Sequence, residues 1–197
     1  MIVQNDFYIN DDPTEVAKNL LGKILYTKID GIITSGIIVE TEAYKGNSDR
    51  ACHAYQNKKT NRNAVMFEKG GKAYVYLVYG IHYLFNIVTN IKGKADAVLI
   101  RALEPVKGEN KMLIRNNKNN LRRITSGPGL LSKAMGIDMS LYGESLLGNR
   151  VWIEYPSKEF DNSKIVHAKR IGVDYAGDDA LLPWRFYIKD NIWISKP

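Results

Sequence analysis

The alternation of apolar and polar residues predicts two β-hairpins in the first half of the chain. The apolar runs "KILYTKI" (residues 23–29) and "IITSGIIVETEAY" (residues 32–44) flank Asp30-Gly31, a dipeptide typical of a two-residue hairpin turn. A second hairpin is predicted by "AYVYLVYGIHYLFNIV" (residues 73–88), which breaks near Gly80-Ile81. This run carries four tyrosines, whose hydroxyl groups need partners when buried, so its composition is not that of a purely core-forming hairpin.

Helix signals and further apolar runs complete the predicted elements. "NDDPTEVAKNLLGK" (residues 10–23) predicts a helix with Asp12 as N-cap, Pro13 at its first position and Gly22 at its end. "SGPGLLSKAMGI" (residues 126–137) predicts a short helix that begins around Gly129.

Between these helices, residues 47–71 are polar and irregular, which is typical of a long functional loop. "AVLIRAL" (residues 97–103) predicts a strand, followed by a helix that opens near Glu104-Pro105. Later strands are predicted near "VWIEY" (151–155), "KIVHAKRIGV" (164–173), "WRFYI" (184–188) and "IWIS" (192–195).

This order of elements favours an α+β fold with a mostly antiparallel curved sheet, flanking helices and a protruding tyrosine-bearing hairpin. The sequence contains no internal repeat and no long linker, so residues 1–197 are expected to form a single domain. A chain of this length buries roughly 70% of its unfolded surface, which is enough for a sizeable core.

Composition and charge limit the possible settings and partners. The single cysteine, Cys52, excludes an internal disulfide, no apolar run approaches the ~20 residues of a membrane span, and the N-terminus lacks the pattern of a signal peptide. An intracellular protein is therefore expected.

The net charge of +7 includes basic clusters at residues 57–63, 117–123 and 167–170. These clusters fit either a solvated basic surface or a phosphate-binding face, and charge alone does not decide between them.

Two carboxylates in "IIVETEAY" (residues 37–44) are the first candidates for chemistry. Strand alternation places Glu40, Glu42 and Tyr44 on one face, where two carboxylates repel each other unless they are exposed or partnered. The pattern fits an exposed edge, a paired-carboxylate metal centre, or one general base with a structural neighbour. Spacing alone does not choose between Glu40 and Glu42.

The other chemistry-bearing residues are scattered. His53, His82, His167 and Cys52 show no zinc-ligand spacing, so neither a metal nor another cofactor is expected, although Mg²⁺ on the two carboxylates remains permitted. Asn86 and Arg101 interrupt apolar strands, where an amide and a charge need specific partners. For Arg101 such a partner is either a structural carboxylate or a ligand.

The ordered combination of motifs resembles the alkyladenine DNA glycosylase family, also called 3-methyladenine or methylpurine DNA glycosylases. The resemblance covers nearly the whole chain from about residue 15. It rests on "VETEAY" (39–44), "CHAY" (52–55), "TNRNAVMF" (60–67), "YVYLVYG" (74–80), "VLIRALEP" (98–105), "SGPGLLSKAMGI" (126–137), "RIGVDYAG" (170–177) and "RFYI" (185–188).

The resemblance implies a role for each matching residue in the base pocket. Glu42 takes the position of the catalytic base in "ETEAY". Tyr44 and Tyr76 match the two aromatic walls that stack on the flipped base. His53 and Asn86 match the pocket residues that help to select it.

Three further positions match residues outside the pocket itself. Arg101 matches the arginine beside the catalytic water, and Ile171 matches the residue whose backbone carbonyl also holds that water. Tyr79, one residue before Gly80, matches the residue that intercalates into the DNA. The tyrosines of the hairpin then serve base stacking and base flipping.

The implied function is a monofunctional DNA-3-methyladenine glycosylase, which flips and excises purines of the 3-methyladenine, 7-methylguanine, hypoxanthine and ethenoadenine class by water attack on the N-glycosidic bond. The expected partner is double-stranded DNA containing damaged purines. The protein is expected to bind it as a monomer, to need no cofactor and not to associate with a membrane. The expected location is at DNA, in the cytoplasm or nucleoid of a bacterium or the nucleus of a eukaryote. Two alternatives stay open: a metal-dependent nuclease using Glu40 and Glu42, and a non-catalytic nucleic-acid-binding module.

Overall fold

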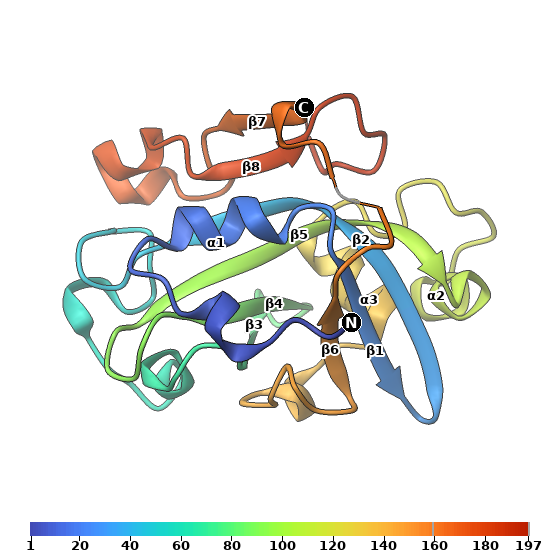
Figure 1. Ribbon diagram of the computed structural model, residues 1–197, viewed down its shortest axis with the longest axis horizontal. Coiled ribbons are helices and arrows are strands. Elements are labelled where there is room, and N and C mark those ends of the chain that lie inside the picture. The colour runs from blue at the N-terminus through green and yellow to red at the C-terminus, as the bar shows by residue number, and fades with distance from the viewer. Residues whose placement is uncertain (159, 197) are drawn as a thin grey trace.

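The computed structural model describes residues 1–158 and 160–196, and its centre is a single antiparallel sheet (Figure 1). The path β3-β4-β5-β2-β1-β6 is extended by β8, which pairs with β2, and by β7, which pairs with β8. The strands are β1 (Ile24–Ile29), β2 (Ile32–Tyr44), β3 (Ala73–Val78), β4 (His82–Thr89), β5 (Asp96–Lys107), β6 (Val151–Glu154), β7 (Ile165–Ala168) and β8 (Arg185–Ile188). The predicted α+β class with a mostly antiparallel sheet is confirmed.

Helices cover the sheet on both sides. Helix α1 packs against β2 and β5, whereas α3 packs against β4 and β5 and also contacts α2. The helices are α1 (Pro13–Leu20), α2 (Glu109–Asn116) and α3 (Pro128–Met135), with short 3₁₀ helices η1 (Asn5–Tyr8), η2 (Tyr55–Asn57), η3 (Ala64–Phe67), η4 (Met139–Leu141), η5 (Asn162–Lys164) and η6 (Asp174–Leu181). None of the helices in the described part of the chain combines the length and apolar character needed to cross a bilayer.

Local sequence signals explain the N-terminal elements. The side chain of Asp12 accepts a hydrogen bond from the Thr14 amide and Pro13 occupies the first turn, as predicted for α1. Asp30 and Gly31 both adopt positive φ (53° and 75°) between β1 and β2, which confirms the two-residue hairpin. Residues 47–71 contain only the short helices η2 and η3, so the long loop is also confirmed.

The predicted helix near Glu104-Pro105 is wrong, because β5 continues to Lys107 and α2 begins only at Glu109. Strand β5 stays extended because it pairs with the long β2 as far as Ser35, and Pro105 lies opposite Gly36 at a shift in register. Gly108 ends the strand at φ 81°, where a Cβ would lie 2.6 Å from the Ile33 carbonyl oxygen. Close packing therefore requires glycine there.

Two other strand predictions need correction. Residues 192–195 form turns rather than a strand, because the Ser195 amide donates to the carboxylate of Glu40 instead of to a neighbouring strand. The run at 164–173 is a strand only to Ala168, and the Ile171 amide beyond it donates to Glu42. In both places side-chain carboxylates replace the ladder partners.

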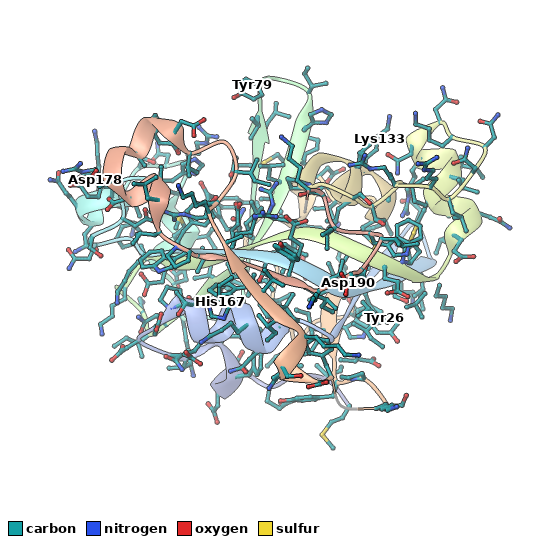
Figure 2. All side chains as sticks on the ribbon, turned by 90° about the horizontal axis from the view of Figure 1, so that it is seen from above. Tyr26, Tyr79, Lys133, His167, Asp178 and Asp190 are labelled. Atoms are coloured by element: carbon teal, nitrogen blue, oxygen red, sulfur yellow. The ribbon has the colours of Figure 1, made fainter. Side chains whose placement is uncertain are left out.

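The tyrosine hairpin of β3 and β4 projects from the side of the sheet opposite α1 (Figure 2). Tyr74 is buried near its base, whereas Tyr79 is 92% exposed at its tip, and the neighbouring Ile81 is 72% exposed. Tyr79 and Gly80 form the turn with positive φ (52° and 69°). The hairpin thus contributes to the core at one end and presents an uncovered aromatic ring at the other.

Candidate active site

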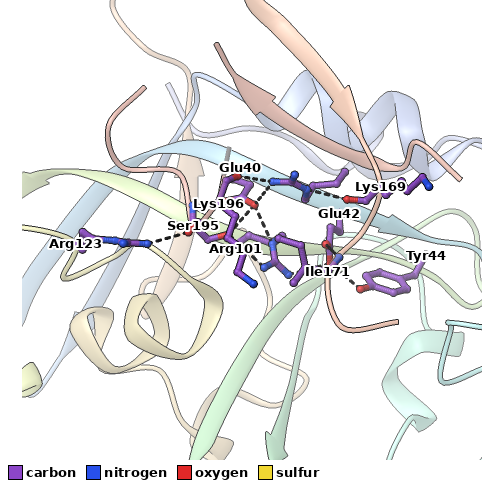
Figure 3. Close-up of polar contacts among 10 residues, drawn as sticks. Glu40, Glu42, Tyr44, Arg101, Arg123, Lys169, Ile171, Ser195 and Lys196 are labelled. Carbon is purple, nitrogen blue, oxygen red and sulfur yellow. Dashed lines mark hydrogen bonds and ion pairs between the residues drawn. The ribbon is translucent and has the colours of Figure 1, made fainter. Parts of the chain in front are cut away.

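Glu42 lies in the middle of the sheet, on β2 between β5 and β8, and its carboxylate is fully buried. Its Oε1 accepts a hydrogen bond of 2.7 Å from the Ile171 amide, and its Oε2 accepts one of 2.7 Å from the Tyr44 hydroxyl. The Arg101 guanidinium lies 3.1 Å from Oε2 (Figure 3). Burial and the adjacent Glu42 raise the pKa of Tyr44 well above its ordinary value, so its hydroxyl keeps the proton that it donates.

Glu40, two residues earlier, is also buried but has a different set of partners. Its Oε1 accepts from Arg101 Nε, Arg185 Nη1 and the Ser195 hydroxyl at 2.8–3.0 Å. Its Oε2 accepts from the Ser195 amide at 2.6 Å. Four donors contact this carboxylate, which is the arrangement of a structural group.

A surface groove of about 510 Å³ connects the residues around Glu42 with the tip of the hairpin. All three partners of Glu42 line it. The lining comprises Tyr44, Ala51, His53, Arg62, Tyr76, Leu77, Val78, Tyr79, Leu84, Leu99, Arg101, Pro128, Ile171, Gly172, Val173 and Tyr175. The groove thus extends from the exposed tip of the hairpin to the residues that cover the Glu42 carboxylate.

A narrow pocket opens from this groove and shares Tyr44, Ala51, His53 and Tyr76 with it. The pocket is also lined by Cys52, Met66, Tyr74, Asn86 and Ala97. Its walls are mostly aromatic and apolar, and His53 and Asn86 are the polar side chains among them that carry nitrogen donors. This combination is typical of a site that holds a flat ring and selects it by hydrogen bonding.

Hydrogen bonds fix the polar residues of the pocket. His53 Nδ1 lies 2.8 Å from the Tyr74 hydroxyl, and the His53 and Tyr76 rings meet edge to face at 4.6 Å. Asn86 Nδ2 donates to the Tyr74 carbonyl oxygen at 3.2 Å. Sequence reasoning did not assign a role to Tyr74, although its position on the same strand face as Tyr76 was a usable signal.

The pKa of His53 is lowered from 6.5 to about 4, mainly by loss of solvent contact and to a smaller extent by the positive charge of Arg62. More than a third of the residue nevertheless stays exposed. Between these two pH values the unfolded chain binds a proton that the folded chain does not, so stability should fall as the pH drops from 6.5 towards 4. We expect His53→Gln to lose less stability than the wild type between pH 7 and pH 5 in urea unfolding. Equal losses would contradict this assignment.

A buried ion pair between Arg170 and Asp49 packs against the ring of Tyr44. The Arg170 guanidinium contacts both carboxylate oxygens of Asp49 and donates to the Ala43 carbonyl oxygen. The same guanidinium lies 4.9 Å from the centre of the Tyr44 ring and 5.2 Å from that of Trp184. Arg170 thereby fixes both the ring of Tyr44 and the chain that leads to Ile171. Neither Asp49 nor Arg170 was a candidate from the sequence, because no pattern distinguishes Asp49 within its polar loop.

The fold brings the sequence-predicted site residues together around one pocket and groove. The residues that line the pocket or the groove are Tyr44, His53, Tyr76, Tyr79, Asn86, Arg101 and Ile171. Glu42 lies behind this lining, in contact with Tyr44, Arg101 and Ile171. The contact observed for Ile171 is made by its amide, and the role of its carbonyl stays a prediction. Within residues 1–158 and 160–196, no group of three or more His, Cys, Asp or Glu side chains is arranged to hold a metal ion.

Comparison with known proteins gives consistent results along the whole chain. The family model for methylpurine-DNA glycosylase (MPG) matches residues 6–192. A Clostridium tetani protein named "Putative 3-methyladenine DNA glycosylase" is 45% identical over 205 aligned positions, which cover 100% of both chains. A Bacillus cereus (strain G9842) protein of the same name is 46% identical over 198 positions, covering 96% of this chain and 97% of its own.

Proposed function

Because the chain belongs to the methylpurine-DNA glycosylase family, we propose that it removes alkylated purines from duplex DNA by hydrolysing the N-glycosidic bond. The observation that carries the proposal is the buried carboxylate of Glu42, paired with Arg101 behind an aromatic pocket. The proposed substrates are 3-methyladenine and 7-methylguanine, together with the neutral bases hypoxanthine and ethenoadenine. Action on DNA inside the cell is part of the same proposal.

Recognition in this proposal begins with base flipping. The target bond is inaccessible inside a duplex, so the nucleotide must leave the stack and enter the pocket. Tyr44 and Tyr76 are proposed to stack on the two faces of the base, with His53 and Asn86 at its edges. Alkylation makes purines such as 3-methyladenine cationic, and an electron-rich ring attracts a cation by roughly 0.5–2 kcal/mol. The aromatic walls would therefore favour the damaged base over the normal one.

Glu42 is proposed to act as the general base that deprotonates the attacking water and stabilises the positive charge developing on the sugar. Arg101 and the Ile171 carbonyl would orient that water. Burial opposes the charge of Arg101, but Glu42 and Glu40 together raise the pKa of this guanidinium, so it stays charged. The base then leaves, and an abasic site remains in the DNA.

The proposal includes monofunctional chemistry, without strand cleavage through a Schiff base. Such cleavage requires an amine within reach of the sugar, most often that of a lysine. Among the described residues that line the pocket and the groove, none is a lysine. Water is therefore the proposed nucleophile.

A metal-dependent nuclease built on Glu40 and Glu42 fits the observed contacts less well. Arg101 lies between the two carboxylates and Arg185 contacts Glu40, so two buried positive charges already neutralise the pair. A divalent cation there would have to displace arginine donors. A non-catalytic binding module would not need a buried carboxylate such as that of Glu42 beside the pocket.

The proposed function is tested with alkylated duplex DNA and with duplexes carrying a single hypoxanthine or ethenoadenine. Released base is measured by chromatography, with and without EDTA. We expect free 3-methyladenine in both conditions and intact strands until the abasic sites are cleaved chemically. Strand cleavage that EDTA abolishes would support the nuclease, and binding without any product would support the binding module.

Replacement of the hairpin tip by Tyr79→Ser should lower excision from duplex DNA while the protein stays folded, because the exposed ring makes no core contribution. Unstacking costs a few kcal/mol per base step, and serine does not fill the gap left by the flipped nucleotide. Excision from single-stranded DNA should change less. Ile114→Ser, at another exposed apolar side chain on α2, is the matched control and should act like the wild type. Wild-type excision from duplexes by Tyr79→Ser would exclude the wedge.

A further inference from the structure

A short segment near the end of the chain, residues 193–196, lies against the ionic cluster behind the site (Figure 3). We call it the C-terminal segment. Ser195 in this segment is buried, and it donates two hydrogen bonds to Glu40, from its amide at 2.6 Å and from its hydroxyl at 2.8 Å. Its hydroxyl oxygen also accepts from Arg101 Nη2 at 3.3 Å. One serine thus contacts both the carboxylate and the guanidinium.

The C-terminal segment is itself held in place by two other arginines. Arg123, in the loop between α2 and α3, donates to the Ser195 carbonyl oxygen at 3.0 Å. Arg185, on β8, donates to the Lys196 carbonyl oxygen at 2.8 Å. Trp193 packs against the main core. Contacts from three separate parts of the fold therefore determine where the hydroxyl of Ser195 lies.

These contacts fix the plane of the Arg101 guanidinium. Its Nε donates to Glu40, its Nη2 donates to Ser195, and its Nη1 faces Glu42. A guanidinium is planar and its donors have fixed relative directions, so holding Nε and Nη2 also determines where Nη1 points. Without the Ser195 hydroxyl, Nη2 has no such partner and Glu40 loses one of its four donors. The guanidinium is then held only by Nε on Glu40 and by Nη1 on Glu42, so its plane is less restrained.

We propose that Ser195 is a positioning residue, which orients Arg101 towards Glu42 directly and through Glu40. The inference rests on the proposed function in assigning Arg101 to the reacting centre. The family match ends at residue 192, so the residue lies beyond the matched region. Its role would be to keep Arg101 at a fixed angle while a base enters the pocket.

The first test compares single-turnover rates of base release on a hypoxanthine duplex with dissociation constants for the same duplex. Ser195→Ala should lower the rate about tenfold with little change in affinity, since small misplacements of a catalytic group can cost up to ~10² in rate. Ser195→Thr keeps the hydroxyl and should retain most of the rate. A wild-type rate for a folded Ser195→Ala protein, or a loss confined to affinity, would overturn the proposal.

A second pair of variants tests the proposal without changing the buried residues Glu40, Arg101 and Ser195. Arg123 and Arg122 are adjacent and exposed, but only the Arg123 guanidinium donates to Ser195. Arg123→Gln should lower the single-turnover rate, by a smaller factor than Ser195→Ala, whereas Arg122→Gln should leave it unchanged. Equal effects of the two variants on the rate would mean that surface charge is responsible, and would overturn the proposal.

A third measurement does not depend on activity. Exchange of the Arg101 Nε–H with solvent, followed by NMR, should be slow in the wild type and faster in Ser195→Ala. Unchanged exchange would contradict the positioning role even if no base were ever released. Slow wild-type exchange that Ser195→Ala accelerates, in a protein that releases no base, would instead support the positioning role and remove the proposed function.

Discussion

Glu42→Gln should lower the rate of base release by at least ~10²-fold, the lower limit for loss of a positioned acid–base group. The amide has nearly the shape of the carboxylate, and it keeps an acceptor for the Ile171 amide or the Tyr44 hydroxyl. The variant should therefore still bind lesion-bearing duplex. Rates are measured under single-turnover conditions with saturating enzyme, so that binding does not limit them.

Glu40→Gln is the matched control for this substitution, since it makes the same chemical change two residues away on the same strand face. Its carboxylate is satisfied by Arg101, Arg185 and Ser195, so its loss should act through stability and the angle of Arg101. The rate should fall less than in Glu42→Gln. Wild-type turnover of Glu42→Gln, or equal metal-dependent losses in both variants, would exclude a single-base hydrolytic mechanism.

Asp49→Ala should destabilise the protein by about 3–5 kcal/mol, because it leaves the buried guanidinium of Arg170 without its carboxylate. The side chains of both residues are fully buried, so water cannot replace the lost partner without opening the loop. The loss is measured as a change in the free energy of unfolding in urea. Since Arg170 also supports the Tyr44 ring, base release should fall along with stability.

Asp11→Ala provides the control for the Asp49 substitution. Asp11 also forms an ion pair, with Lys94, but its side chain is 82% exposed. Solvent screens an exposed pair and leaves it little effect on stability, so this variant should be close to the wild type in stability. If the two alanine variants were equally stable, the Arg170 pair would not support the pocket as described.

Prediction from sequence was most accurate where the signal was local. Asp12 and Pro13 determine the start of α1, and Asp30-Gly31 determines the first hairpin, because the physical cause lies within a few residues in each case. Errors arose where a distant partner overrides local preference. Pro105 favours the end of a strand, yet pairing with β2 keeps β5 extended past it.

The candidate site residues came from the resemblance, and their roles stay predictions; other residues that contact them were not found from the sequence. The ordered motifs selected Glu42 and the pocket residues. The fold brings the pocket residues to one pocket and groove, with Glu42 buried directly behind Tyr44, Arg101 and Ile171. Asp49 and Ser195 were missed. Asp49 lies in an irregular loop where alternation carries no information, and Ser195 lies in a segment that was wrongly predicted as a strand. Their partners Arg170 and Glu40 are 121 and 155 residues away in the chain.

By itself, the sequence determined the hairpins and the first helix, because turn chemistry, capping and alternation act over a few residues. The resemblance selected Glu42, but only the tertiary structure gives the physical difference between Glu42 and Glu40. The two carboxylates have the same chemistry and share a strand face, so the chain between residues 37 and 44 holds no difference between them. The difference comes from Arg185 and Ser195, which saturate one carboxylate, and from Tyr44, Ile171 and Arg101, which hold the other behind the groove.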